Sequence, residues 1–189
     1  EMADLPAPAA DPASVRQLQA QLARCRDILA RLREQARHPE SLPARSLSDH
    51  VDNCLQPLHV LYPACRFSVS VDAPAHAAVA LPWLLQQVLY NGLKNAAEAA
   101  MAEVGLMVTL TDETLTCCIR DDGPGYGEDV LRGLERPATS GKPGGLGLGL
   151  FLAYTTLGRF GGTVRLMPRD GGGTLCRLTL PLAALKVTA

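Results

Sequence analysis

The sequence has no excess of charge of either sign. Its 189 residues carry 18 basic and 19 acidic side chains, and the isoelectric point lies near 6.5. Nucleic-acid binding normally needs a basic face, so we expect no nucleic-acid partner and expect any bound anion to be held locally. Hydrophobic residues make up 47% and charged residues 20%, which excludes a disordered chain. The length allows one domain and an appendage.

Metal-binding and redox motifs are also missing. The six cysteines include no Cys-x-x-Cys pair and no Cys/His cluster with zinc spacing, so we interpret them as reduced intracellular thiols. The longest stretch without Asp, Glu, Lys or Arg is 73–93, and its two prolines, one histidine and three amides make it a poor membrane span. No signal peptide is visible. Because the chain opens on Glu1, we expect it to be the cytoplasmic part of a longer protein.

Two common nucleotide signatures fail when tested. Gly141-Lys142 is followed by Pro143 where a P-loop needs Ser or Thr. Gly145-x-Gly147 is followed by Leu150 where a dinucleotide fingerprint needs glycine. The motif also follows a loop, whereas the fingerprint follows a strand. These mismatches exclude a P-loop enzyme and a Rossmann enzyme.

The N-terminal part is predicted to be an appendage. Residues 1–14 carry three prolines among alanines and favour a flexible lead-in, and 15–45 hold a helix and a linker. Apolar residues recur at heptad spacing over 15–38: Val15, Leu18, Leu22, Cys25, Leu29, Leu32 and Ala36. This narrow seam predicts a homodimer through helix 15–38. The alternative is that it folds back on its own globular domain.

Residues 46–189 alternate between helical and strand patterns. Helices are expected at 46–62, 82–101 and 146–160, and strands at 66–72, 105–110, 114–120, 163–167 and 174–180. In the first helix we assign Val51, Leu55, Leu58 and Leu61 to the apolar face. The order predicts an α+β domain with a mostly antiparallel sheet backed by helices on one face.

Polar residues of the second of these helices form one face. Asn91 and Asn95 are four residues apart and Glu98 follows three residues later. Amide oxygens and one carboxylate suit a hydrated Mg²⁺, which takes few protein ligands and shares phosphate and water. A solvated helix face is the alternative interpretation.

Glycines gather in one third of the chain, with 15 of 17 between Gly123 and Gly173. Asp121-Asp122-Gly123-Pro124-Gly125 ends a strand with a carboxylate that can accept from an exocyclic amine, although a plain tight turn has the same pattern. Gly145-Leu-Gly147-Leu-Gly149 opens a helix, where free N–H groups favour anionic oxygens. Packing is the alternative use of such glycines.

Together these stretches resemble the N, G1 and G2 boxes of sensor histidine kinases, in order and spacing, and the resemblance covers about residues 46–182. It implies the Bergerat ATP-binding fold, an α/β sandwich shared with Hsp90, DNA gyrase B and MutL. The segment 24–29 and the Asp-Asp-Gly-Pro-Gly box look most like the redox-responsive RegB/PrrB type. The resemblance further implies a response-regulator partner and a parent protein anchored in the bacterial inner membrane.

The resemblance implies a role for each matching residue. Asp121 would read the adenine amine with Thr174 close to the same base edge, and Asn95 would ligate Mg²⁺ with Asn91 near the phosphates. The implied nucleotide site contains Asn91, Asn95, Glu98, Asp121, Gly123, Gly125, Thr139, Ser140, Lys142, Gly145, Gly147, Gly149 and Thr174. Thr139, Ser140 and Lys142 lie where such kinases place a lid, but the usual aromatic box of that lid is missing.

Four histidines stand in the chain, and none is followed by the acidic residue and proline that mark a phosphoacceptor. We therefore expect the acceptor histidine upstream of this chain, and nucleotide binding without self-phosphorylation. Cys25 is interpreted either as a redox switch, because Arg24 and Arg26 favour its thiolate, or as a small buried hydrophobe. Two other functions stay open: an ATPase of the same superfamily, which would need Glu where Asn91 stands, and a dimeric module with a vestigial site.

Overall fold

A mixed five-stranded sheet organises the part of the chain that this computed structural model describes, residues 44–74, 77–127 and 148–188. Those residues all lie in the second of the chain's two units, 39–189. The strand order is β2 (Arg66–Asp72), β4 (Glu103–Leu110), β5 (Thr114–Asp121), β7 (Thr174–Pro181) and β6 (Thr163–Pro168). β2 and β4 pair in parallel, and the other neighbours pair antiparallel.

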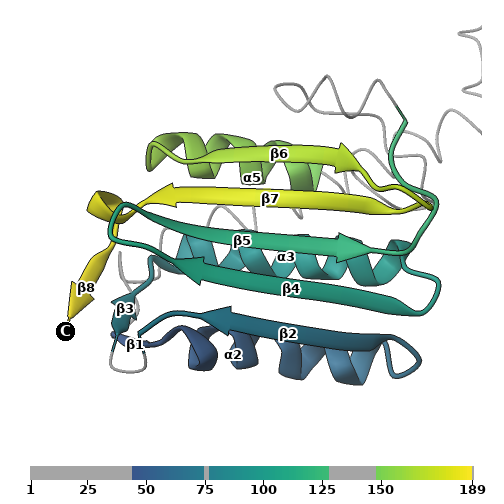
Figure 1. Cartoon of the computed structure of the whole chain (residues 1–189), viewed down its shortest axis with the longest axis horizontal. Helices are drawn as coiled ribbons and strands as arrows, with labels where there is room; N and C mark the ends of the chain where they lie inside the picture. Colours follow the sequence, from purple (N-terminus) through teal and green to yellow (C-terminus); the bar gives the residue numbers. More distant parts are fainter. Residues whose placement is uncertain (1–43, 75–76, 128–147, 189) are drawn as a thin grey trace, which may run out of the picture. The chain divides into compact units, whose positions relative to one another are not determined.

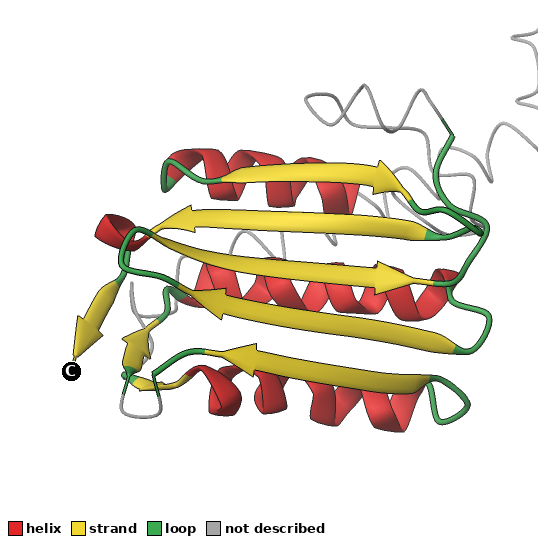
Figure 2. Cartoon of the chain, viewed as in Figure 1, coloured by secondary structure: helices red, strands yellow, loops and turns green. Residues whose placement is uncertain are grey.

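Three helices pack on one face of this sheet. They are α2 (Leu47–Leu61), α3 (Trp83–Ala99) and α5 (Leu148–Arg159), and Figure 1 shows all three behind the strands. Parallel strands need a long crossover, and α3 supplies it between β2 and β4. The described residues leave the opposite face of the sheet without a covering layer, as Figure 2 shows.

Local signals explain where the helices begin and end. Ser46 caps α2 because its hydroxyl accepts a hydrogen bond from the Asp49 N–H at 3.1 Å. Pro63 follows the last turn of α2, where a proline cannot continue the helix. Pro82 stands immediately before α3. An N–H at this position would have no acceptor within the helix, so proline costs no hydrogen bond there.

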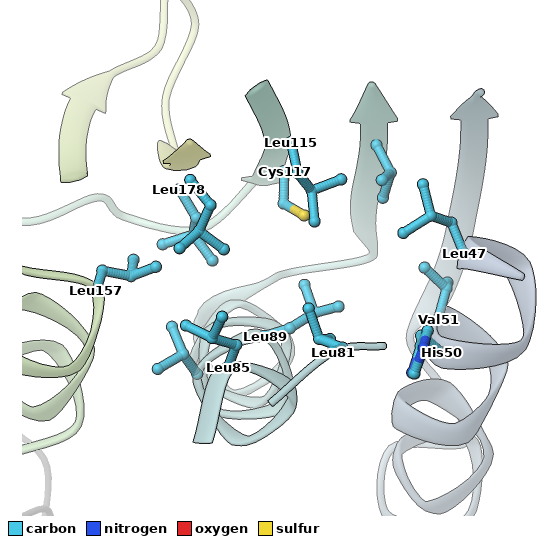
Figure 3. Close-up of a pocket in the computed structure, with 13 residues that line it drawn as sticks. Leu47, His50, Val51, Leu81, Leu85, Leu89, Leu115, Cys117, Leu157 and Leu178 are labelled. Atoms are coloured by element: carbon cyan, nitrogen blue, oxygen red, sulfur yellow. The ribbon is translucent and has the colours of Figure 1, made fainter. Parts of the chain in front are cut away.

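The core lies between the helices and the sheet. Leu58, Leu93, Ile119 and Leu157 are among its fully buried side chains and come from α2, α3, β5 and α5. A cavity of about 30 Å³ remains inside this core. Figure 3 shows leucines of α3 below it and sheet side chains above it. No described residue of the N, G1 or G2 boxes lines this cavity, so it is a packing defect of the core and not the predicted nucleotide site.

One polar side chain, His50, reaches this cavity from α2 and is 1% exposed. Its Nε2 lies 2.8 Å from the Val79 carbonyl oxygen. A carbonyl only accepts, so Nε2 donates this hydrogen bond. Among the described residues Nδ1 has no partner, which makes His50 a costly residue at the centre of an apolar core.

The sequence patterns predict this α+β architecture correctly, with every helix and strand boundary within about two residues where the structure describes it. Leu61 is an error: it is 56% exposed, because it lies in the last turn of α2 and finds no covering partner there. A small second sheet of β1 (Arg45–Ser46), β3 (Ala78–Ala80) and β8 (Lys186–Thr188) was not foreseen. Strands of two or three residues are too short to show an alternation of apolar and polar residues.

Two other expectations concern the heptad helix and a membrane span. The heptad helix 15–38 lies outside the described residues. No described helix is long and apolar enough to cross a membrane.

Candidate nucleotide-binding site

Asp121 is the last residue of β5 and is 5% exposed. Antiparallel pairing of β5 with β7 brings the start of β7 beside it, because Arg120 is in register with Leu175. Its Oδ1 accepts from the Gly123 N–H at 3.0 Å and from the Thr174 N–H at 3.3 Å. This fixes one carboxylate oxygen on the backbone, which leaves Oδ2 as the oxygen available to a ligand.

Glycines allow the chain to pack closely around Asp121. A Cβ on Gly173, where φ is +90°, would lie 2.0 Å from the Asp121 carbonyl oxygen. The same carbonyl accepts a hydrogen bond from Nη1 of Arg169 in the β6–β7 turn. A Cβ on Gly123 would lie 2.2 Å from the carbonyl oxygen of Ala99, the last residue of α3. The G1 segment is therefore in direct backbone contact with the end of the helix that carries the N box.

Asp122 also stabilises the contact between the G1 segment and the end of α3. Its carboxylate accepts from the backbone N–H groups of Met101, Ala102 and Glu103 at 2.8–3.2 Å, in the turn between α3 and β4. The N–H groups of Ala102, Glu103 and Met101 lower the pKa of the Asp122 carboxyl. No motif in the sequence indicates this role for Asp122, and its adjacency to Asp121 is the available signal.

Asp122→Asn is expected to weaken folding at neutral pH by about 1 kcal/mol, because the amide accepts less strongly than a carboxylate. The folded pKa is lowered, so this contribution is present above the unfolded pKa of about 4 and is lost as the pH falls through the folded pKa. Urea unfolding of both proteins from pH 7 to pH 3 measures the difference. Asp112→Asn in the β4–β5 turn controls for net charge, and a difference that stays constant with pH contradicts the assignment.

The N box and the G2 box also meet. Asn91 and Asn95 are half-buried on α3. A Cβ on Gly149, in the first turn of α5, would lie 3.3 Å from Nδ2 of Asn95. A side chain at position 149 would press on the amide, so glycine there keeps Asn95 open beside the N-terminus of α5. The unpaired N–H groups of such a helix end favour anionic oxygens.

Glu98 is engaged within the fold. Its Oε1 lies 2.9 Å from Nζ of Lys94, one turn earlier on α3, and accepts from the Tyr62 hydroxyl at 3.2 Å. Tyr62 follows α2, so this carboxylate links the ends of two helices. The structure therefore gives Glu98 a packing role, and its contact with nucleotide stays a prediction.

Tyr126 is a residue that sequence reasoning missed. It follows Gly125, whose φ of +79° needs glycine, and its ring packs against the core. Burial raises the pKa of the Tyr126 phenol to about 12, with Cys176, Asp121 and Glu98 adding to the rise. The phenol therefore stays protonated beside the site and remains a hydrogen-bond donor. No sequence pattern signals this position, because a single tyrosine after a glycine-rich turn belongs to no alternation or regular spacing.

Several predicted site residues lie outside the described residues: Thr139, Ser140, Lys142, Gly145, Gly147 and Cys25. Of the other cysteines, burial raises the pKa of Cys54, Cys117 and Cys176 to about 12, which fits inert core thiols. Cys65 and Cys118 are only half-buried, and Cys65 packs against the edge of the core.

The donor set fits a hydrated magnesium ion. Among the described residues there is no group of three or more His, Cys, Asp or Glu that could enclose a metal. Mg²⁺ keeps most of its waters and needs only one or two protein oxygens together with ligand phosphate. The half-buried amide of Asn95, kept open by Gly149 at a helix N-terminus, meets that requirement.

Fold and site together define an α+β sandwich in which a helix under the sheet, the end of a central strand and a glycine-opened helix converge. The family model for histidine kinase-, DNA gyrase B- and HSP90-like ATPases matches residues 81–184. The chain belongs to this family. The Bergerat-type α+β fold that the sequence predicted is thereby confirmed, and catalytic domains of histidine kinases share it.

Individual relatives are sensor kinases. The chain is 34% identical over 104 residues to sporulation kinase E of Bacillus subtilis, covering 53% of this chain and 14% of that kinase. It is 30% identical over 135 residues to the C4-dicarboxylate transport sensor protein DctB of Rhizobium meliloti, covering 68% and 22%. The catalytic domain of histidine kinase ThkA matches with a TM-score of 0.66 at 19% identity, over 76% of this chain and 96% of that one. The chain thus spans less than a quarter of either curated relative.

Proposed function

We propose that this domain binds ATP and supplies its γ-phosphoryl group to a histidine of a longer sensor kinase. The observation that supports the proposal is the convergence of four separate segments. Asp121 bonds to Thr174, Gly123 touches the end of α3, and Gly149 stands beside Asn95. These contacts gather the N box, the G1 box, the described end of the G2 box and the start of β7 around one place.

The carboxylate of Asp121 suits the adenine amine. One oxygen is held by two backbone N–H groups, so the other keeps a fixed direction and can accept from an exocyclic N–H. Thr174 is 2% exposed and its N–H donates to the same carboxylate, so its hydroxyl would lie near the base edge. Gly123 and Gly125 would line the base pocket, and each lets the backbone pack closely: a Cβ would lie 2.2 Å from the Ala99 carbonyl oxygen at position 123 and 3.3 Å from the Gly173 carbonyl oxygen at position 125.

The phosphates would lie between α3 and the start of α5. Asn95 would ligate Mg²⁺, Asn91 would assist near the phosphates, and Gly145, Gly147 and Gly149 would border the triphosphate at the helix N-terminus. Bound Mg²⁺ neutralises charge on the phosphoryl group, and the chain's own task is to position the nucleotide. Thr139, Ser140 and Lys142 would close over it.

Transfer needs partners beyond this chain. We propose that the acceptor histidine lies upstream, that helix 15–38 forms the homodimer, and that a response regulator receives the phosphoryl group. We also propose that the parent protein is anchored in the inner membrane. The comparisons support histidine kinases in general. The RegB/PrrB type, with Cys25 as a redox switch, is the finer part of the proposal and rests on the sequence resemblance.

Asn95→Ala is expected to reduce the effect of Mg²⁺ on nucleotide affinity by about tenfold, because it removes the proposed ligand. Calorimetric titration with a non-hydrolysable ATP analogue, with Mg²⁺ and with chelator, measures this difference directly. Asn53→Ala, at an exposed position of α2, is the matched control and should behave like the wild type.

Each outcome of this titration separates the candidate functions. If the wild type binds no nucleotide under either condition, the domain is an interaction module with a vestigial site. If it binds and Asn95→Ala responds to Mg²⁺ as the wild type does, the metal ligand is elsewhere. Steady hydrolysis of ATP by the isolated chain would favour an ATPase, which Asn91 disfavours because it stands where a water-activating glutamate is needed.

A further inference from the structure

The uncovered face of the sheet carries an unbalanced set of charges. Alternation along the strands places Arg120 of β5, Arg177 of β7 and Arg165 of β6 on this face, because their sequence neighbours are buried on the helix side. All three arginines are exposed. Figures 1 and 2 show this face in front of the strands with no described element across it.

Two of these arginines oppose each other directly. Arg165 and Arg177 are Cα partners across β6 and β7. Like charges in such a position destabilise a sheet by about 0.2–1 kcal/mol. Among the ion pairs of the described residues, no carboxylate pairs with either guanidinium. The pair therefore gains no ion-pair energy within the described fold, and a carboxylate brought by a partner would remove a repulsion that water and salt only screen.

The rest of the face does not supply that anion. Glu103 on β4 lies 3.6 Å from Arg66 and 3.8 Å from Arg120, and Ser68 donates to it at 3.0 Å. One carboxylate is thus shared by two arginines at the β2–β4 side. Positive charge remains concentrated on β6 and β7, where Thr163 and Thr179 form the register pair two residues further along the strands.

We propose that this arginine face, defined by Arg120, Arg165 and Arg177, is a docking surface for an acidic segment of a partner protein. Guanidinium groups bind carboxylates in a fork geometry. Directly opposed strand residues are about 5 Å apart, and acidic residues one helical turn apart have a similar spacing of about 5–6 Å. An acidic helix can therefore place one carboxylate on each arginine.

A protein fits this surface better than a nucleic acid. A duplex is bound through many phosphate contacts along a basic track. The face offers three arginines, one of which already shares Glu103, and the chain as a whole has a net charge of −1. The arginine face is also separate from the nucleotide site, because Arg120 and Asp121 are consecutive residues that point to opposite faces of β5.

The test uses the whole chain and a labelled helical alanine-based peptide with glutamate at every fourth position. Fluorescence anisotropy is measured for this peptide and for a version with glutamine in place of glutamate. The variant is Arg165→Ser with Arg177→Ser, and the control is Arg159→Ser, an exposed arginine at the end of α5 on the helix side. Nucleotide titration of the same variants shows whether the fold and the site are intact.

We expect the glutamate peptide to bind at least about tenfold more tightly than the glutamine peptide, and expect added salt to weaken it. The double variant should lose this preference and keep its nucleotide affinity, while Arg159→Ser retains both. The location is read from Cys118, the register partner of Arg177 on the same face, whose alkylation rate should fall when the peptide is bound.

Three results overturn the proposal. One is equal binding of the two peptides, and a second is unchanged binding by the double variant. The third is a duplex oligonucleotide that displaces the peptide and protects Cys118 more strongly, since it would assign the face to nucleic acid. A wild type that binds the peptide but no nucleotide leaves the docking surface standing and contradicts only the proposed function.

Discussion

Asp121→Asn is expected to lower the affinity for ATP by about tenfold to a hundredfold while leaving the domain folded. The asparagine oxygen can still accept from the N–H groups of Gly123 and Thr174, so the two backbone bonds are kept. The second oxygen becomes an NH₂ group, which faces the adenine amine donor to donor. A hydrogen bond to a charged group is worth about 1.5–3 kcal/mol, and its loss gives this range.

The base specificity of the variant separates this explanation from general damage. Inosine triphosphate carries a carbonyl where adenine carries its amine, so the asparagine NH₂ should bind it better than the carboxylate does. Calorimetry with both nucleotides should show a smaller preference for adenine in Asp121→Asn than in the wild type. Asp112→Asn serves as control in the distant β4–β5 turn, and equal ATP affinity in Asp121→Asn and wild type would remove Asp121 from the pocket.

Gly173→Ala is expected to cost about 2–6 kcal/mol of unfolding free energy. Position 173 has φ near +90°, a conformation that strains an alanine by about 1–3 kcal/mol. The new Cβ would also lie 2.0 Å from the Asp121 carbonyl oxygen, which is backbone and cannot rotate away. Overpacking of this kind adds about 1–3 kcal/mol. Urea denaturation measures the sum, and nucleotide affinity should fall as well, because Asp121 must move.

Gly171→Ala provides the matched control, two residues earlier in the same turn. Its φ is +86°, yet a Cβ there has nothing within 4 Å. Gly171→Ala should therefore show the strain of the positive φ alone, and the difference between the two variants gives the cost of the contact with Asp121. If both variants lose the same stability, the close approach to β5 has no energetic weight.

Periodicity was sufficient to predict most of the fold, because its elements are long and amphipathic. α3 buries Leu85, Val88, Leu89 and Leu93 along one stripe, and β5 alternates without a break. The small sheet of β1, β3 and β8 could not be predicted, since its strands are two or three residues long. Leu61 was misassigned because a helix pattern does not show where the supporting sheet stops.

The candidate site was predicted from motifs. Asn95, Asp121, Gly123 and Gly149 were selected because their spacing resembles three boxes, and the structure brings the segments that carry them together. Their contact with nucleotide stays a prediction. Asp122 and Arg169 were missed, because their partners are backbone atoms of distant residues. Only the folded chain shows that the carboxylate of Asp122, next to Asp121, accepts hydrogen bonds from the turn after α3.

The bond between Thr174 and Asp121 joins residues 53 positions apart, with all of α5 and β6 between them. On the ribosome, the candidate pocket therefore stays incomplete until the last long strand has emerged and paired with β5. Pairings over such distances form slowly. A nascent chain stopped before residue 174 would hold the helices and most of the sheet yet lack the wall that fixes Asp121. Ligand capture is thus coupled to the synthesis of β7 by the order of the strands.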